Sequence, residues 1–284
     1  LGAVSALAVD FSPPELRATG LGLIGIFKSL GAAVGPPVAM VLADAFGFPA
    51  VFFTCTVVGF AGVVCSWLLR DDSGERAAQR TGDEMDVGYN STAGPAWLRP
   101  WFEVLATSPA RFATLTVAVV ATCQGAIVTF VPLFGESLNV AYHSWYFAVL
   151  SAFGMLGGIV AGALSDRFGR LRTLVPTLFF FGAGVVVLAG FASPTMAVVS
   201  AVMAGAGFTG NLVILGSMMS ENAPARRTGV VFHLQEGAVD VGMGIGSFVY
   251  GLAAEPFGFA LSFIGVGAVT MAWGVIVLAR YARR

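Results

Sequence analysis

The chain has 284 residues, of which 57% are hydrophobic and only 11% charged, and its formal net charge is −1. A soluble domain usually carries about 25% charged residues, so this composition excludes an ordinary soluble protein and indicates a surface that faces lipid. A nearly neutral chain also lacks the basic face that a nucleic-acid partner requires.

Long apolar segments follow one another along the chain. Residues 1–9 are apolar but too short to cross about 30 Å of hydrocarbon, which takes roughly 20 helical residues, and they predict the end of a helix that begins upstream. Eight longer segments each predict a membrane-spanning helix, because backbone polar groups in lipid must be satisfied within the segment. These segments are 18–43, 49–69, 112–134, 144–164, 172–192, 195–219, 228–253 and 259–280.

A hydrophilic stretch, residues 70–107, separates the second span from the third. It is rich in Asp, Glu, Gly, Arg and Ser, and it predicts a linker between two groups of helices. Near its end, Trp97, Trp101 and Phe102 are suited to an interfacial helix with the aromatic rings at headgroup level.

The basic residues fall on one side of this succession of spans. Of 15 Lys and Arg residues, fourteen lie in turns on one side, none lies on the other, and Lys28 lies within a span. By the positive-inside rule that side is cytoplasmic, together with the linker and the C-terminus. The fourteen are Arg17, Arg70, Arg76, Arg80, Arg99, Arg111, Arg167, Arg170, Arg172, Arg226, Arg227, Arg280, Arg283 and Arg284.

The chain carries an internal repeat with a shift of 211 residues. The shift places Gly31 on Gly242, Gly35 on Gly246, and the segment 46–48 on 257–259, with Phe-Gly-Phe in both places. The first two spans are therefore expected to be structural twins of the last two.

Residues 162–172 read Gly-Ala-Leu-Ser-Asp-Arg-Phe-Gly-Arg-Leu-Arg, in a turn predicted to be cytoplasmic. This segment is similar to the G-x-L-x-D-R-x-G-R-[KR]-x signature of the major facilitator superfamily, apart from Leu171 at the first basic position of the pair. The chain as a whole resembles that family. The resemblance implies an all-α membrane protein with twelve helices in two halves, and an alternating-access transport mechanism. Residues 1–69 would then be the end of helix four with helices five and six, 70–110 the cytoplasmic central linker, and 111–284 helices seven to twelve.

A second pattern lies in the first full span. Gly22, Gly31, Gly35 and Pro36 fit the spacing of a glycine motif in helix five of the drug/proton antiporter branch, although Ala39 and Met40 replace its final glycines. Small residues of this kind let two helices approach closely. The expected partner is helix eleven, and the match favours efflux over uptake.

Charged residues at membrane depth indicate function, because each costs at least about 2.5–3.5 kcal/mol on insertion scales. Lys28 lies near the middle of its span, and the repeat places it one residue from the position of Asp240. His233, Glu236 and Asp240 share one helix face. Glu236 or Asp240 is a candidate to take and release a coupling proton, and the alternative is a fixed Lys–carboxylate pair that only holds the halves together.

Two uncharged polar residues also lie in mid-span. Gln124 and Asn211 occur in spans that the resemblance places beside the central cavity. Each is expected either to contact solute or to hydrogen-bond across helices as packing.

The signature turn predicts a cytoplasmic latch. The resemblance implies that Asp166 meets a helix N-terminus and that Arg170, after Arg167, pairs with Glu221. Asp10, the repeat twin of Glu221, would serve the corresponding turn of the other half. The alternative is a solvated charged turn.

The sequence favours a proton-coupled exporter of a small organic or amphipathic compound. The alternatives are an importer of a small metabolite and a truncated chain without activity. A metal or hydrolase site at His233, Glu236 and Asp240 is a further alternative, but HExxH, a GxSxG motif with an oxyanion partner, and a Walker loop do not occur. We therefore expect no enzyme, catalytic residue, metal or cofactor, and a monomeric multi-pass protein of the plasma or inner membrane.

Overall fold

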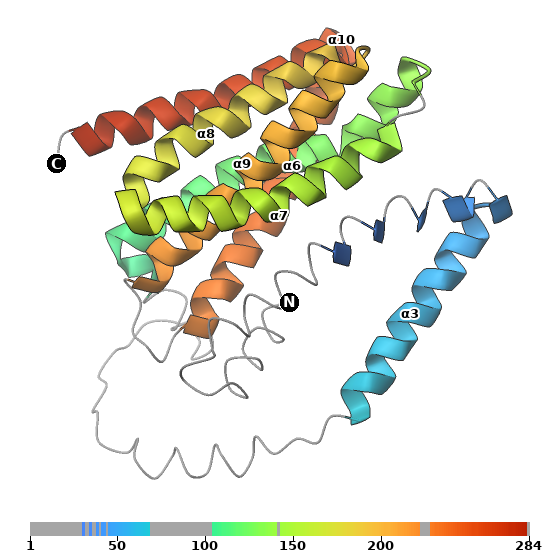
Figure 1. Ribbon diagram of the computed structural model, residues 1–284, viewed down its shortest axis with the longest axis horizontal. Coiled ribbons are helices and arrows are strands. Elements are labelled where there is room, and N and C mark those ends of the chain that lie inside the picture. Colours follow the sequence, from blue (N-terminus) through green and yellow to red (C-terminus); the bar gives the residue numbers. More distant parts are fainter. Residues whose placement is uncertain are drawn as a thin grey trace. The chain divides into compact units, whose positions relative to one another are not determined.

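The computed structural model describes residues 30–31, 34–35, 38–39, 41–43, 45–68, 104–140, 143–221 and 228–282. Over these ranges every regular element is a helix, as Figure 1 shows. The chain divides into two units, one of residues 38–99 and one of residues 1–37 with 100–284. In the smaller unit, helix α3 runs from Phe48 to Leu68 and is apolar and exposed along its length.

Five long helices and one short one of the larger unit lie wholly within the described residues. They are α6 (Ser108–Ser137), α7 (His143–Phe168), α8 (Arg170–Val187), the 3₁₀ turn η2 (Leu188–Gly190), α9 (Pro194–Glu221) and α10 (Thr228–Ala282). With α3, six described helices are long and apolar enough to cross a membrane. Seven of the eight predicted spans lie on them within a few residues, and the eighth, 18–43, lies mostly outside the described residues.

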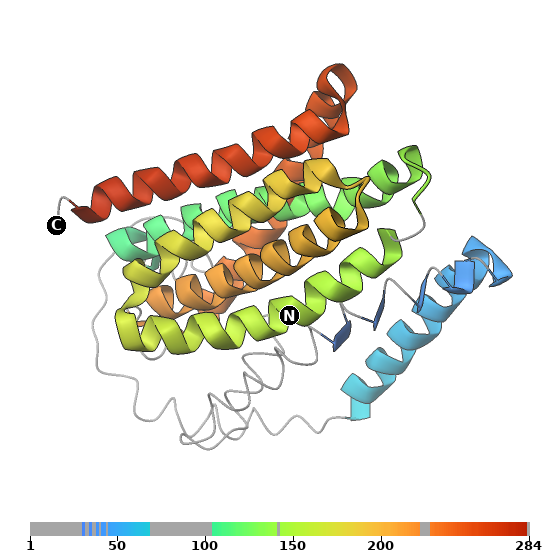
Figure 2. The ribbon, with the colours of Figure 1, turned by 45° about the horizontal axis from the view of Figure 1, so that its top comes forward.

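Helix α10 is two helices joined at a break. Gly258 has φ 75° and ψ 166°, a conformation that is essentially restricted to glycine. We call residues 228–257 the first arm of α10 and residues 259–282 its second arm; Figure 2 shows the sharp bend between them. Gly47, the repeat twin of Gly258, also has positive φ, 79°, just before α3. The two copies of the repeat thus each place a glycine with positive φ at the equivalent position.

Close helix crossings in the larger unit depend on glycine. Helix α6 packs on the first arm of α10, and a Cβ added at Gly246 would lie 1.9 Å from the carbonyl oxygen of Thr122. A Cβ at Gly242 would lie 2.5 Å from the carbonyl oxygen of Ala118. Real Cβ atoms do not approach a backbone so closely, so the two helices touch backbone to backbone, as small residues allow in membranes. Helices α7 and α9 also pair in this way.

An aromatic cluster fills the end of the unit where the two arms of α10 meet. The Tyr250 ring lies 4.5 Å from Phe130 and 4.6 Å from Phe263 between centroids. The Tyr250 hydroxyl donates to the carbonyl oxygen of Phe259 at 2.8 Å, which ties the first arm to the second across the break. Buried aromatic rings and one satisfied hydroxyl therefore hold the reversal in place.

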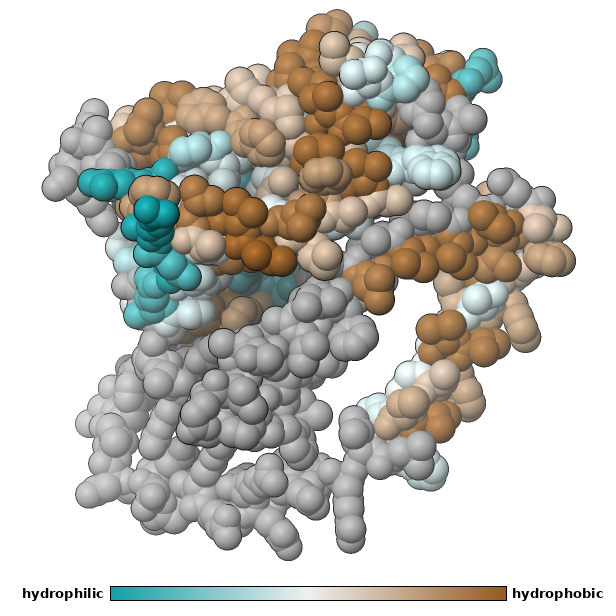
Figure 3. Space-filling view, in the orientation of Figure 1, coloured by the Kyte–Doolittle hydropathy of each residue, from teal (hydrophilic) through white to brown (hydrophobic). Residues whose placement is uncertain are grey.

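The surface of the larger unit divides by polarity. Most of the lateral surface visible in Figure 3 is hydrophobic, as expected of helices in lipid. Large apolar side chains of this unit, such as Ile159, Phe248 and Leu252, are exposed. Hydrophilic side chains gather where α7 ends and α8 begins (Figure 3).

Candidate functional site

The signature turn joins α7 to α8 at Gly169. Ser165, Asp166 and Arg167 occupy the last turn of α7, and Arg170 is the first residue of α8. Gly169 between them has φ 94° and ψ 149°, close to a conformation that is essentially restricted to glycine. The glycine in the signature is thus a backbone requirement, because it lets α8 start directly after α7 with Arg170 turned back toward Asp166.

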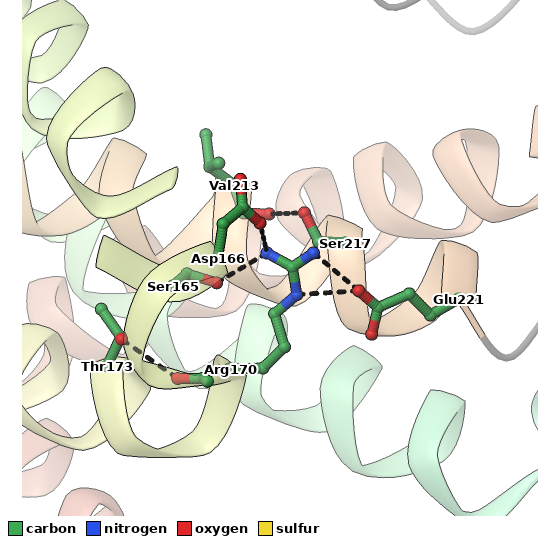
Figure 4. Close-up of polar contacts among 8 residues, drawn as sticks. Ser165, Asp166, Arg170, Thr173, Val213, Ser217 and Glu221 are labelled. Carbon is green, nitrogen blue, oxygen red and sulfur yellow. Dashed lines mark hydrogen bonds and ion pairs between the residues drawn. The ribbon is translucent and has the colours of Figure 1, made fainter. Parts of the chain in front are cut away.

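Arg170 is the centre of a polar cluster, drawn in Figure 4. Its Nε and Nη2 both donate to Oε1 of Glu221, at 2.9 and 2.6 Å. Its Nη1 donates to Oγ of Ser165 at 2.7 Å and to Oδ1 of Asp166 at 2.6 Å. All three guanidinium nitrogens are therefore engaged, and the predicted fork from Arg170 to Glu221 is present.

The cluster joins the ends of three helices. Asp166 comes from α7, Arg170 from α8 and Glu221 from the end of α9. The side chain of Arg170 is 25% exposed, while those of Asp166 and Glu221 are 69% and 53% exposed. An exposed ion pair contributes only about 0.2–1 kcal/mol, so the cluster fixes the relative positions of three helix ends more than it stabilises the fold.

Other members of the predicted latch lie apart from this cluster or outside the described residues. The guanidinium of Arg167 lies over the ring of Phe168, 5.4 Å from its centroid. Asp10 lies outside the described residues. Asp166 bonds Arg170. Residues 222–227, which lead into the N-terminus of α10, lie outside the described residues. Contact between Asp166 and a helix N-terminus thus stays a prediction.

The two uncharged mid-span residues have different surroundings. Asn211 is fully buried; its Oδ1 accepts from the Thr177 hydroxyl at 2.8 Å, and its Nδ2 donates to the Thr177 carbonyl at 3.3 Å. This pair joins α9 to α8, as expected of a packing contact. Gln124 is 5% exposed, and its Oε1 has no hydrogen-bond partner among the residues that the structure describes. A buried, unpaired amide oxygen costs free energy and calls for a ligand or a water molecule.

The charged mid-span residues lie on the first arm of α10. Glu236 is half-buried and Asp240 is exposed, while Lys28 lies outside the described residues. Among the residues that the structure describes, no three His, Cys, Asp or Glu side chains are grouped so as to hold a metal ion. His233, Glu236 and Asp240 share a helix without converging on a metal site.

The glycine motif of the first full span can be compared with its repeat twin. Gly31 and Gly35 are described, and a Cβ at either would meet none of the described residues within 4 Å; Gly22 and Pro36 lie outside the described residues. The twin glycines of α10 pack on α6 of the larger unit, as described above. The packing partner of Gly31 and Gly35 stays a prediction.

Sequence reasoning missed several polar contacts between helices, among them a bridge from Gln235 and the hydrogen-bond partner of Asn211. Gln235 is 9% exposed and donates from Nε2 to the Leu212 carbonyl at 2.9 Å, joining α10 to α9. The sequence did contain a signal for Gln235, because it is a polar residue beside Glu236 in an apolar span. Thr177 gave no signal, because a threonine can satisfy its hydroxyl on its own helix.

Comparison with known proteins decides the family. The family model described as Major Facilitator Superfamily matches residues 1–232 and 143–284 of the chain. The chain belongs to the Major Facilitator Superfamily. The all-α membrane fold predicted from the sequence is thereby confirmed, and the chain is a multi-pass integral membrane protein of a transporter family, not an enzyme.

Two curated relatives are distant. An uncharacterized MFS-type transporter of Methanocaldococcus jannaschii is 21% identical over 266 residues, which cover 92% of this chain and 66% of the relative. Myo-inositol transporter 1A of Cryptococcus neoformans var. grubii serotype A is 28% identical over 119 residues, which cover 42% of this chain and 21% of the relative. The chain therefore spans less than two thirds of the length of either protein.

A solved structure shares the fold. It is a bacterial homolog of the human lysosomal transporter Spinster, in an inward-facing and unoccupied conformation. The TM-score is 0.64 at 17% sequence identity, over 98% of this chain and 72% of the other. Members of the superfamily carry small solutes, often coupled to an ion, and the signature turn with the Arg170 cluster lies within this shared fold.

Proposed function

We propose that the chain is the larger part of a proton-coupled exporter of small organic or amphipathic compounds that works by alternating access. In this proposal α6, α7, α8, α9 and the two arms of α10 are helices seven to twelve, and the basic ends of the helices and the C-terminus are cytoplasmic. The transporter is a monomer in the plasma or inner membrane.

The observation that carries proton coupling is a pair of carboxylates on a membrane-spanning arm. Glu236 and Asp240 are one helical turn apart on the first arm of α10, and Asp240 is exposed. A charge at this depth costs free energy unless it serves a pathway for an ion or substrate. Either carboxylate is suited to exchange a proton with a central cavity, with Lys28 as a nearby cation.

The coupling test uses reconstituted full-length transporter with an imposed pH gradient. Glu236→Gln and Asp240→Asn are expected to abolish proton-driven flux and to leave solute exchange without a gradient partly intact. Glu255→Gln is the matched control, because Glu255 is an exposed carboxylate on the same helix beside the Gly258 break. If all three variants and the parent show equal proton-driven flux, Glu236 and Asp240 take no part in proton coupling.

The direction of transport rests on the glycine spacing at Gly22, Gly31, Gly35 and Pro36, which favours efflux. The similarity to a myo-inositol transporter supports a second candidate, an importer of a polyol or similar metabolite. Counterflow measurements distinguish them. Stimulated exchange of an amphipathic cation without exchange of myo-inositol supports the exporter, and the reverse pattern supports the importer.

The Arg170 cluster is proposed to act as the cytoplasmic latch. Because its three charged members come from one half, it holds the ends of α7, α8 and α9 in the arrangement that meets the other half when the cytoplasmic side closes. Asp166→Asn and Arg170→Ala are then expected to reduce turnover with little loss of folded protein. Arg167→Ala is the matched control at the same helix ends.

A double-mutant cycle tests the latch contact itself. Arg170→Ala combined with Glu221→Gln is expected to be scarcely worse for turnover than either change alone, because both remove the same pair of hydrogen bonds. Fully additive losses would show that this contact does not carry the effect.

A further inference from the structure

A pocket lies where several helices of the larger unit end together. We call this the basic end, because Arg111, Arg170, Arg172 and Arg280 lie within the first or last turn of their helices there. The pocket encloses about 430 Å³ of empty space, part of it open to solvent. Its lining includes Ser108 and Phe112 of α6, Leu171 of α8, Met218 of α9, and Val277 and Arg280 of α10.

The lining is apolar except at one edge. Phe112, Leu171, Met218 and Val277 form hydrophobic walls, and Ser108 and Arg280 add a hydroxyl and a cation. The guanidinium carbon of Arg280 lies 5.8 Å from the centroid of the Phe112 ring, a cation–π contact that keeps the charge beside the pocket. The pocket thus combines a hydrophobic wall with a positive edge.

The helix ends add to this positive charge. Helices α6 and α8 both begin beside the pocket, neither has an acidic residue in its first turn, and neither N-cap makes a side-chain hydrogen bond. Their uncapped N–H groups carry partial positive charge. Among the described residues, the carboxylates near this end are Asp166 and Glu221, and both bond Arg170 rather than Arg280. Within that part of the chain, the charge of Arg280 faces no carboxylate and can meet an anion.

We propose that this pocket binds one anionic phospholipid, with its phosphate at Arg280 and Ser108 and part of an acyl chain on the wall formed by Phe112 and Leu171. A membrane-spanning protein meets such lipids from the bilayer, and a basic pocket between helix ends is complementary to their headgroups. A free phosphate would leave the hydrophobic wall unfilled, and a zwitterionic lipid would add a positive group to the positive edge. The proposal does not depend on the transported solute or on proton coupling.

The test is native mass spectrometry of the full chain in detergent, titrated with phosphatidylglycerol or phosphatidylcholine of the same chain length. The parent is expected to retain one phosphatidylglycerol in preference to phosphatidylcholine. Arg280→Gln is expected to weaken phosphatidylglycerol binding about fivefold, which corresponds to roughly 1 kcal/mol for one basic residue at an anionic surface. Arg280→Lys keeps the charge and is expected to retain most of the binding.

Two further variants separate the pocket from general surface charge. Arg167→Gln removes the same charge at the same helix ends but outside the pocket lining, and it is expected to leave binding unchanged. Leu171→Trp narrows the pocket from its partly exposed wall without changing charge, and it is expected to weaken binding. Inorganic phosphate at millimolar concentration is expected not to displace the lipid.

Several results would overturn the proposal. An equal loss in Arg167→Gln and Arg280→Gln would mean diffuse attraction, and displacement by phosphate would mean a simple anion site. Stronger lipid binding in Trp101→Ala would mean that the chain segment before Ser108 occupies the pocket instead. Equal binding of the two lipids by the parent would show that the charge of the headgroup does not determine binding.

Discussion

Gly246→Ala is expected to push α6 away from the first arm of α10. The added Cβ would lie 1.9 Å from the carbonyl oxygen of Thr122 and 2.6 Å from its carbonyl carbon. Both are backbone atoms that cannot rotate away, so the helices must separate. Separation also opens the neighbouring contact of Gly242 with Ala118. Overpacking of this kind costs about 1–3 kcal/mol.

Gly244→Ala is the matched control. Gly244 lies on the same arm two residues earlier, and a Cβ there would meet nothing within 4 Å. The change should be neutral or should stabilise the helix by about 0.5–1 kcal/mol, because alanine loses less backbone entropy than glycine.

The assay is the fraction of purified chain that stays monodisperse in detergent after a fixed heat challenge over a range of temperatures. Gly246→Ala should lower the half-inactivation temperature relative to the parent, and Gly244→Ala should not. Identical curves for the two variants would refute a backbone contact between these helices at Thr122.

In the same heat challenge, Asn211→Leu is expected to lower the half-inactivation temperature, because it breaks two hydrogen bonds to Thr177. Gln124→Leu is expected to leave that temperature unchanged, because the oxygen that it removes has no partner among the described residues. Reversed effects would contradict the assigned environments. Gly169→Ala is expected to cost about 1–3 kcal/mol from backbone strain and to weaken the Arg170 contacts, measured as a turnover loss like that of Arg170→Ala. In a cysteine-free background, Phe168→Cys should react with an impermeant maleimide only from the cytoplasm and Asn139→Cys only from the other side; labelling of both from one side would contradict the topology.

Hydropathy and turn composition were enough to predict the helices. Runs of about 20 apolar residues leave the chain no other way to satisfy its backbone in lipid. The predicted spans 228–253 and 259–280 therefore match the two arms of α10. The repeat paired Gly47 with Gly258, and the structure gives both glycines a positive φ, which the sequence reasoning did not predict.

Side-chain contacts between helices could be predicted only where a family motif implies the partner. The pairing of Arg170 with Glu221 came from the family resemblance, which implies that the signature arginine pairs with an acidic residue. The sequence left two alternatives for Asn211 and Gln124, because a hydropathy pattern does not say which way a mid-span amide points. Thr177 shows the reason: its hydroxyl bonds its own helix as well as Asn211.

The reversal at Gly258 has a practical consequence for handling the protein. The two arms of α10 meet at a single glycine, and the hydroxyl of Tyr250 binds the carbonyl of Phe259 just beyond it. This turn therefore offers no spare chain for an epitope tag, a protease site or a fused domain. The turn after α6 differs, because Asn139 is exposed there between two separate helices. An inserted tag should be displayed at Asn139 without loss of folded protein, whereas the same tag at Gly258 should prevent the last helix from packing.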